Sequence, residues 1–532
     1  MEGRSAARLA RAVFLIGLIA LPVSSARAAS AAARVPADFN GDGYSDLAVG
    51  TLNDDGGTVD DAGSVNVLYG SASGLSAAND QQWHQDSLNV SDQAEAGDAF
   101  GASLASGDLN DDGYADLAVG APGEDVLVGA TTVEDAGVVH VFFGSPDGLV
   151  AAAGNPLTQG SGDVPGVPEA GDLFGEQLAA GNLDDHPRAE LVIAAPWEAV
   201  SGEDGTGTVT ILFSDNSGLF TAGSTVWHQD QPRLLDDGEE NEFFGSSLAI
   251  GNLGKTPHGD LVIGVARENV DLGEEGAVHV LYGSDNGPRK RGQRFLHGNN
   301  RGIPGKAQYD SAFGQNLEIA NFGKSRQGDL AIAAPRRRVG GDMHGSVYVL
   351  YGTPTGVSTD GADMFHQDTH GVRGEVEFVD VVGEGFGHAV TGADLGGSKH
   401  ADLAVGVYYE SVGDVPAAGA SHVLFGSKKG VIARGDLLLT QTPPDVPTDA
   451  SQNDQFGWSL ALANFGRTER ADLAVASIGE DVNAFESAGA VTIFYGRPTG
   501  PDPSVGELWS QATTDVEGDV EAFDFFGTDL EP

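Results

Sequence analysis

The segment Phe100–Pro122 has the sequence FGASLASGDLNDDGYADLAVGAP, in which two short apolar runs enclose a loop rich in Asp, Asn and Gly. Short apolar runs that end at Gly, Asp or Pro are typical of β-strands rather than of helices. A second loop of the same kind, DFNGDGYSDLAVG, spans Asp38–Gly50 and begins 70 residues earlier. The chain therefore repeats a β-rich unit.

The repeat extends along the chain. Phe-Gly pairs recur at intervals of 69 to 74 residues, and each Phe is followed four positions later by Leu or Val. The pairs begin at Phe100, Phe174, Phe244, Phe313, Phe386, Phe456 and Phe526. Each full unit also contains a second segment such as DLAVGAP, a third such as GAVHVLYGS and a fourth such as STVWHQD. Four short strands per unit favour a propeller blade over a solenoid repeat.

The order of these motifs resembles that of the FG-GAP repeat. The resemblance rests on the Phe-Gly pair that opens a unit, on Gly120–Pro122 at the end of its second strand, and on the Asp-rich loop between them. This repeat builds the integrin α-subunit propeller and many secreted bacterial proteins. The resemblance implies an all-β fold, a seven-bladed β-propeller made of four-stranded blades.

The repeat also predicts the limits of the propeller and how the ring closes. A single propeller over residues 29–532 divides into repeats at about 29–98, 99–172, 173–242, 243–311, 312–384, 385–454 and 455–524, with a closing strand at 525–532. The first repeat lacks a Phe-Gly strand, whereas the chain ends in FFGTDLEP. We expect Phe525–Leu530 to complete the first blade, because an unclosed propeller leaves strand edges unpaired. The alternative is a partial eighth repeat.

The N-terminal residues have the pattern of a secretory signal. Basic residues precede the apolar run Ala12–Val23, and small residues follow it up to Ala28. This pattern predicts a signal peptide over residues 1–28 and a secreted, extracellular protein. The apolar run is shorter than the ~20 residues that cross a bilayer, so we expect no membrane insertion.

The composition is strongly acidic and free of cysteine. The chain has 78 Asp and Glu residues, 28 Lys and Arg residues, a formal charge of −50 and no Cys. Such a charge repels nucleic acid and attracts cations and basic partners, although it also serves solubility. Disulfides are excluded, so stability has to come from packing and from bound ions. We expect a monomer whose ligand is macromolecular or on a cell surface, and either basic or bridged by a cation.

The two Asp-rich loops have the spacing of calcium sites. Side-chain oxygens stand at places one, three, five and nine, a Gly stands at place six, and the backbone carbonyl of place seven adds a further oxygen. The ligand candidates are Asp38, Asn40, Asp42, Tyr44 and Asp46 in the first loop, and Asp108, Asn110, Asp112, Tyr114 and Asp116 in the second. Ca²⁺ takes six to eight oxygens, so these loops predict Ca²⁺ as the cofactor. The alternative is a turn without an ion.

The five other loops depart from this pattern, and we do not assign Ca²⁺ to them. Three of them carry a cation at place four, namely Lys255, Lys324 and Arg467. This cation either replaces the lost ion beside the Asp at place nine or is an ordinary solvated side chain, which is our expectation.

Blade topology places the calcium loops on one face of the ring and the variable loops on the other. The variable loops are rich in carboxylates, and Asp236, Asp237, Glu239 and Glu240 are our candidates for a binding face. The tripeptide Arg434–Asp436 spells RGD at the start of a fourth strand, and we attribute it to chance.

These observations predict a secreted, calcium-binding propeller that acts as a binding or adhesion module and is not an enzyme. The alternative is an extracellular hydrolase with its active site at the top centre of the ring. The sequence contains no HExxH or GxSxG motif. A cluster of His and carboxylate side chains at the mouth of the central channel would favour the enzyme.

Overall fold

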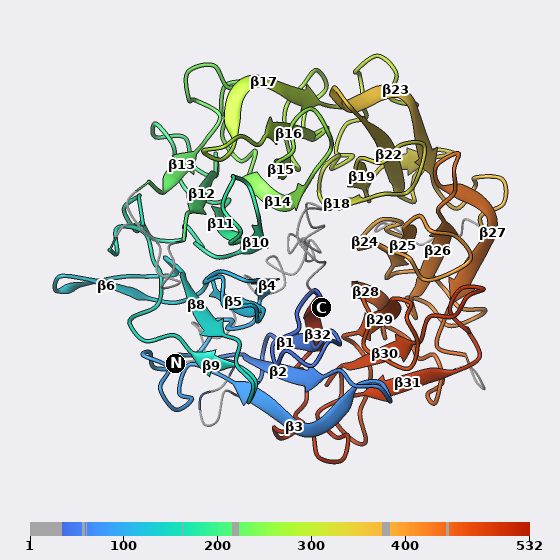
Figure 1. The fold of residues 1–532 in the computed structure, drawn as a ribbon, viewed down its shortest axis with the longest axis horizontal. Helices are drawn as coiled ribbons and strands as arrows, with labels where there is room; N and C mark the ends of the chain where they lie inside the picture. The colour runs from blue at the N-terminus through green and yellow to red at the C-terminus, as the bar shows by residue number, and fades with distance from the viewer. Residues whose placement is uncertain are drawn as a thin grey trace.

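The computed structural model describes residues 35–55, 59, 61–162, 164–214, 223–374, 384–442 and 446–532. The predicted signal peptide, residues 1–28, lies outside them. The elements of the described residues are β-strands, and seven four-stranded antiparallel sheets stand around a central axis (Figure 1). The prediction of an all-β, seven-bladed β-propeller is therefore confirmed.

Each blade runs from an inner strand beside the axis to an outer strand at the rim. The inner strands are β32 (Phe526–Glu531), β4 (Ser103–Gly107), β10 (Gln177–Gly181), β14 (Phe244–Gly251), β18 (Leu317–Ala320), β24 (Val390–Ala393) and β28 (Phe456–Ala463). The second strands are β1 (Leu47–Thr51), β5 (Asp116–Ala121), β11 (Glu190–Ala195), β15 (Asp260–Val265), β19 (Asp329–Ala334), β25 (Asp402–Val407) and β29 (Asp472–Ser477). The third strands are β2 (Ser64–Tyr69), β8 (Val138–Phe143), β12 (Thr208–Leu212), β16 (Ala277–Tyr282), β22 (Ser346–Thr353), β26 (Ala420–Phe425) and β30 (Ala490–Phe494). The outer strands are β3 (Ser76–Trp83), β9 (Val150–Ala151), β13 (Thr225–Trp227), β17 (Arg289–Leu296), β23 (Gly356–Phe365), β27 (Ile432–Leu439) and β31 (Gly506–Trp509).

The ring closes through the last strand of the chain. Strand β32 pairs with β1, so that the first blade has the order β3-β2-β1-β32. Val49 lies opposite Leu530, and Thr51 lies opposite Phe526. The prediction that the C-terminal strand completes the first blade is confirmed, and the alternative of a separate eighth repeat is wrong.

The Phe-Gly pairs join each blade to the one before it. The Phe100 N–H donates to the carbonyl of Ala62 in the preceding blade at 2.9 Å, and the six other Phe residues make the corresponding bond. The Phe100 side chain is fully buried. Gly101 has φ +91, and a Cβ there would lie 2.6 Å from the Ser64 carbonyl oxygen. This position therefore requires glycine, because the neighbouring blade leaves no room for a side chain.

The hydrophobic core lies between neighbouring blades. One cluster joins Val49 and Leu530 of the first blade to Val491 and Ile493 of the seventh. Every residue of the second strands is buried, because each of these strands is covered on both faces by adjacent blades. This explains why these strands have continuous apolar sequences rather than alternating ones.

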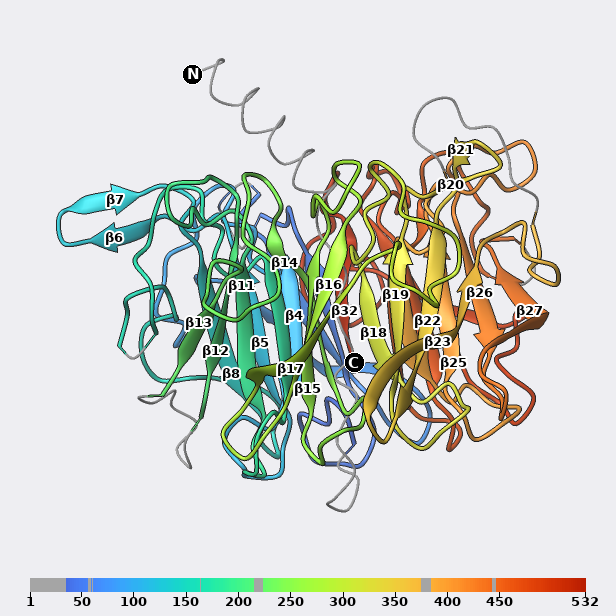
Figure 2. The same cartoon turned by 90° about the horizontal axis from the view of Figure 1, so that it is seen from above.

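The connecting loops divide between two faces. The loops between inner and second strands share one face, here called the bottom, with the turns between third and outer strands, since Gly144 in such a turn donates to Asp116. The other loops form the top face, where the hairpins β6–β7 (Val126–Val128 and Thr131–Val133) and β20–β21 (Arg338–Val339 and Asp342–Met343) project (Figure 2). Among the described residues no helix has the length and apolarity needed to cross a bilayer.

Candidate metal-binding loops

The first bottom loop gathers its oxygens around its own backbone. The Asp42 N–H lies 2.9 Å from both Asp38 Oδ1 and Asn40 Oδ1, which brings these two oxygens close together. The Gly43 N–H donates to Asp38 Oδ2 at 2.9 Å, and the Tyr44 N–H donates to Asp42 Oδ1 at 3.0 Å. The oxygens at places one and three therefore meet at the Asp42 N–H, and an oxygen of place five lies at the Tyr44 N–H two residues on.

The second bottom loop has the same arrangement. The Asp112 N–H donates to Asn110 Oδ1 at 2.8 Å, and the Gly113 N–H donates to Asp108 Oδ2 at 3.1 Å. The Tyr114 N–H donates to Asp112 Oδ1 at 2.9 Å. The structure thus brings together the predicted side chains of places one to five in each loop.

The carboxylates of the first loop lie close to one another and are partly shielded from solvent. Burial raises the pKa of Asp38, and the charge of Asp42 raises it further. Burial also raises the pKa of Asp46 to about 8, to which the charges of Asp38 and Asp42 contribute. A hard cation beside these carboxylates would remove their repulsion, so the donor set fits Ca²⁺.

The Asp at place nine has a structural role that the sequence did not reveal. Asp46 is buried, and its two oxygens accept the N–H groups of Phe39 at 2.8 Å and of Gly70 at 2.9 Å. Asp260 makes the same pair of bonds in a loop without the other acidic ligands. In both kinds of loop, the Asp at place nine therefore connects the loop to the following turn by two hydrogen bonds, and this pair of bonds is here called the staple. A carboxylate oxygen has further lone pairs, so a ligand role for Asp46 and Asp116 stays a prediction.

Backbone hydrogen bonds link the bottom loops of neighbouring blades. The Ala115 N–H donates to the Asp38 carbonyl at 3.1 Å, and the Ala189 N–H donates to the Asp108 carbonyl at 2.9 Å. Tyr114 packs on the first loop, where a Cβ at Gly41 would lie 2.5 Å from the Tyr114 ring. The two candidate metal loops therefore contact each other, and ordering one constrains the next.

Comparison with known proteins agrees with this architecture. The model of the FG-GAP repeat matches residues 100–142, which include the second loop and strands β5 and β8. This chain folds as an integrin-like FG-GAP propeller. The family resemblance inferred from the Phe-Gly and Gly-Ala-Pro motifs is confirmed.

Relatives of this FG-GAP propeller fall into two groups. Integrin alpha-3 of Mus musculus is 25% identical over 204 residues, which are 37% of this chain and 18% of the integrin. Phosphatidylinositol-glycan-specific phospholipase D of Bos taurus is 30% identical over 185 residues, 35% of this chain and 20% of that protein. The Dictyostelium discoideum phospholipase of the same name is 22% identical over 335 residues, 60% of this chain and 34% of the enzyme. The chain thus spans between 18% and 34% of the length of these relatives.

Three bottom loops carry a cation at place four. In these loops the cation does not enter the loop and lies over a tyrosine ring. Lys324 Nζ lies 3.4 Å from the centre of the Tyr351 ring and 3.0 Å from Asp363 on the outer strand. Lys255 lies over Tyr282 in the same way, at 4.0 Å, and Arg467 over Tyr495, at 3.7 Å. All three residues are exposed, as expected for solvated cations, and each also makes a cation–π contact with a tyrosine. The contact was not visible in the sequence, because the cation stands in a bottom loop and the tyrosine at the end of the third strand of the same blade.

A second charged cluster on the bottom face was not predicted. His258 is buried between blades three and four, with Nε2 at 3.1 Å from Asp285 and Nδ1 at 3.5 Å from Asp185. Ligand atoms of the three side chains lie within 4.8 Å of one another. Both ring nitrogens already face oxygens, so the cluster acts as a hydrogen-bonded bridge between the blades.

The predicted binding residues lie on the top face and differ in their contacts. The carboxyl group of Asp236 contacts the carboxyl group of the buried Glu268. Glu239 accepts a hydrogen bond from the Asn269 amide at 3.0 Å. All four residues are exposed, so a ligand in solution can reach each of them.

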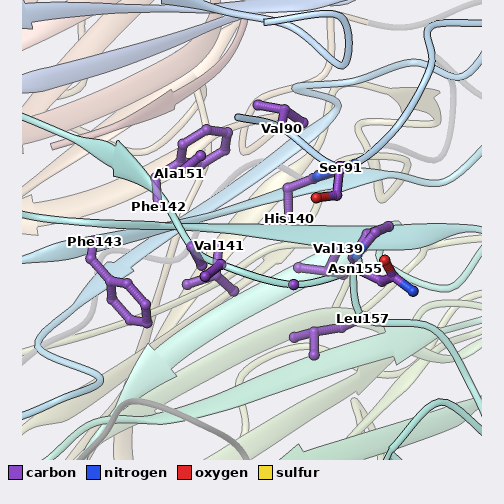
Figure 3. A pocket seen from close by; sticks show the side chains of 14 residues that line it. Val90, Ser91, Val139, His140, Val141, Phe142, Phe143, Ala151, Asn155 and Leu157 are labelled. Atoms are coloured by element: carbon purple, nitrogen blue, oxygen red, sulfur yellow. The ribbon is translucent and has the colours of Figure 1, made fainter. Parts of the chain in front are cut away.

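A small hollow lies against strand β8 of blade two (Figure 3). It measures about 70 Å³ and is lined mainly by the backbone and side chains of β8 and of residues 151–157. His140 in this hollow lies 3.2 Å from Asp92, but in the described structure it makes no hydrogen bond with the neighbouring Ser91.

The RGD tripeptide is part of the structure rather than a ligand motif. Asp436 is fully buried, pairs with His422 at 2.9 Å and accepts the Arg373 N–H at 2.7 Å. A receptor cannot reach this carboxylate without unfolding the blade, which supports attributing the tripeptide to chance.

Proposed function

We propose that this FG-GAP propeller is a calcium-binding, extracellular binding module. The observation that supports the proposal is the matching arrangement of oxygens in two adjacent bottom loops. In the first loop, burial and the charge of Asp42 raise the pKa of Asp38, and burial and the charges of Asp38 and Asp42 raise the pKa of Asp46. Bound Ca²⁺ would neutralise the negative charge of these carboxylates. Its ligands would be Asp38, Asn40, Asp42, Asp46 and the Tyr44 carbonyl, with Asp108, Asn110, Asp112, Asp116 and the Tyr114 carbonyl in the second loop.

Calorimetric titration with Ca²⁺, after removal of metal by a chelator, tests the ion sites. We expect two bound ions per chain and none in the double variant Asp42→Ala and Asp112→Ala. The matched control is Asp147→Ala and Glu469→Ala, two exposed bottom-face acids outside the candidate ligands. Equal calcium binding by all three proteins would contradict the proposal.

We also propose that the acidic top face binds a basic macromolecular partner. Asp236, Asp237, Glu239 and Glu240 lie together on one loop, and exposed carboxylates speed the association of basic partners. Neutralising all four should slow binding to immobilised oligolysine and weaken its salt dependence. Neutralising only Asp237 and Glu240 is compared with neutralising Asp147 and Glu469, which changes the net charge by the same amount. Equal effects of the two pairs would mean that only net charge matters.

Secretion belongs to the same proposal, because it rests on the N-terminal pattern and on the composition. Expression of the full chain in a secreting host, followed by N-terminal sequencing of the exported protein, tests it. Cleavage after Ala28 is the expected result, and a product that retains residues 1–28 inside the cell would contradict it.

A hydrolytic function is the alternative, and the similarity to a phospholipase favours it. That similarity covers at most 34% of the enzyme. Assays with phosphodiester and carboxylic ester substrates would decide between the two. Turnover that survives purification and depends on top-face residues at the ring centre would replace the binding module as the main function.

A further inference from the structure

The top face contains a repeated group of three buried side chains at the blade interfaces. Between blades one and two, Gln85 follows the outer strand of the first blade, and its Nε2 donates to Glu124 of the second at 2.6 Å. The third member, Asp98, stands two residues before the Phe-Gly pair of the second blade. All three side chains are buried.

The same group occurs at six of the seven interfaces. At each of them a glutamine donates to an acid after the second strand of the next blade, and that blade has another acid two residues before its Phe-Gly pair. The groups are Gln85, Glu124 and Asp98; Gln159, Glu198 and Asp172; Gln229, Glu268 and Glu242; Gln367, Glu410 and Glu384; Gln441, Glu480 and Asp454; and Gln511, Asp54 and Asp524.

The seventh interface replaces all three members together. Between blades four and five, Gly298 stands at the place of the glutamine, and Arg337 and Ser311 stand at the places of the two acids. Arg337 donates instead to the Lys306 carbonyl at 2.7 Å. Joint presence at six interfaces and joint loss at one indicate that the three side chains act as a unit.

Several of these groups bring carboxyl groups into direct contact. In one of them Glu268 contacts both Glu242 and Asp236, whereas the first two groups each contain a single pair of acids. Asp98 is hydrogen-bonded to Glu124, and Asp172 is hydrogen-bonded to Glu198. Two ionised carboxylates have no hydrogen to share, so each contact requires one proton. The glutamine fits this arrangement, because Nε2 of Gln85 and of Gln159 supplies a donor to the second acid while Oε1 has no partner.

The charged groups near these two pairs of carboxyl groups are mainly acidic. Glu95 and Asp92 face the pair of Asp98 and Glu124, and Glu169 faces the pair of Asp172 and Glu198. Asp125 and Asp135 line the small hollow beside Asp98. The nearby base is His140, which lies 3.2 Å from Asp92. Burial first, and the neighbouring acid second, raise the pKa of Glu124 and of Asp172 above their usual range.

We propose that the interfaces between blades one and two and between blades two and three each bind one proton, shared between Asp98 and Glu124 and between Asp172 and Glu198. The proton holds together the two acids of one blade where the glutamine of the preceding blade donates to one of them, on the face opposite the calcium loops. Its loss leaves two negative charges in a buried interface and weakens the contact between the blades.

The sign of the pH effect follows from linkage. A raised pKa in the folded state means that folding takes up protons, so the contribution to stability is complete below the unfolded value near pH 4. It is lost as the pH rises through the higher folded values. Unfolding at neutral pH should therefore release protons.

The test is urea unfolding of the full chain between pH 5 and pH 9 in saturating Ca²⁺, together with proton release in weak buffer. The variant is Glu124→Gln with Glu198→Gln. A glutamine there can donate to the ionised Asp98 or Asp172 and still accept from Gln85 or Gln159, so it imitates the protonated acid. The matched control is Glu134→Gln with Glu203→Gln, at exposed top-face acids.

We expect the parent and the control to lose stability as the pH rises. The Gln variant should have a folded-to-unfolded ratio at least tenfold higher than the parent at pH 9 and should release about two fewer protons on unfolding. An unchanged pH slope in the variant would overturn the proposal. Recovery of the parent's stability at pH 9 by added Na⁺ or K⁺, but not that of the variant, would also overturn it, because the occupant would then be a metal ion. If the Gln variant does not fold, Asp98→Asn with Asp172→Asn is measured against the same outcomes.

Discussion

The bottom loops of blades one and five have the same backbone conformation but carry side chains of opposite charge. In both, the Asp at place nine staples the loop to the following turn, through Asp46 in one and Asp329 in the other. Place four is left-handed in both, with φ +75 at Gly41 and +60 at Lys324. The first loop then gathers carboxylates inward, whereas the second sends an ammonium outward over a tyrosine ring.

This comparison indicates that the conformation of the loop is independent of the charge of its side chains. The staple and the left-handed turn occur without acidic ligands, so the loop conformation does not itself require an ion. Places one, three and five decide whether negative charge accumulates. The following predictions test this independence, beginning with the largest expected effect.

Removal of calcium should affect the acidic loops strongly. A ligand at 100 times its Kd stabilises the folded state by ~2.7 kcal/mol per site, so two sites give ~5 kcal/mol. Thermal unfolding with and without a chelator measures this effect. Asp42→Ala with Asp112→Ala should abolish it, while Lys324→Met should leave it intact. A response to chelator in the double variant would remove the distinction between the two kinds of loop.

Loss of the staple should cost the same in both loops once calcium is absent. Asp46→Asn and Asp329→Asn each replace one acceptor oxygen by an amide that faces a backbone N–H. A buried donor without a partner costs ~1–3 kcal/mol. Urea unfolding in chelator should give similar losses for the two variants. A loss for Asp46→Asn that appears in calcium but not in chelator would mean that place nine of the first loop serves only the ion.

Loss of the lysine over the tyrosine should have the smallest effect. Lys324→Met keeps the aliphatic stem and removes the charge above Tyr351. A partly exposed cation–π contact is worth ~0.5–1 kcal/mol. Urea unfolding should show a loss of this size that is independent of calcium, with Lys428→Met as an exposed control. A larger loss in calcium than in chelator would connect Lys324 to the ion sites.

The periodic signals in the sequence were sufficient for the fold. The Phe-Gly spacing predicted the blades because each Phe joins two of them, and the missing first strand predicted closure by Phe525–Leu530. The candidate metal loops were also visible, since their ligands lie within nine consecutive residues. Contacts across blades were not visible. Gln85 meets Glu124 across 39 positions, and the place-nine staples bond to backbone N–H groups that every residue type carries.

Closure of the first blade by β32 also determines the order in which this chain can finish folding. The Leu104 N–H donates to Asp529, 425 positions away along the chain. Contacts this distant in sequence raise the contact order and slow folding, because a long loop has to close before they form. During synthesis β1 emerges before the other strands of the ring, and its inner edge stays unpaired until β32 has emerged. The earliest blade to be translated is therefore the last to be completed, and it is the most exposed to aggregation in the meantime.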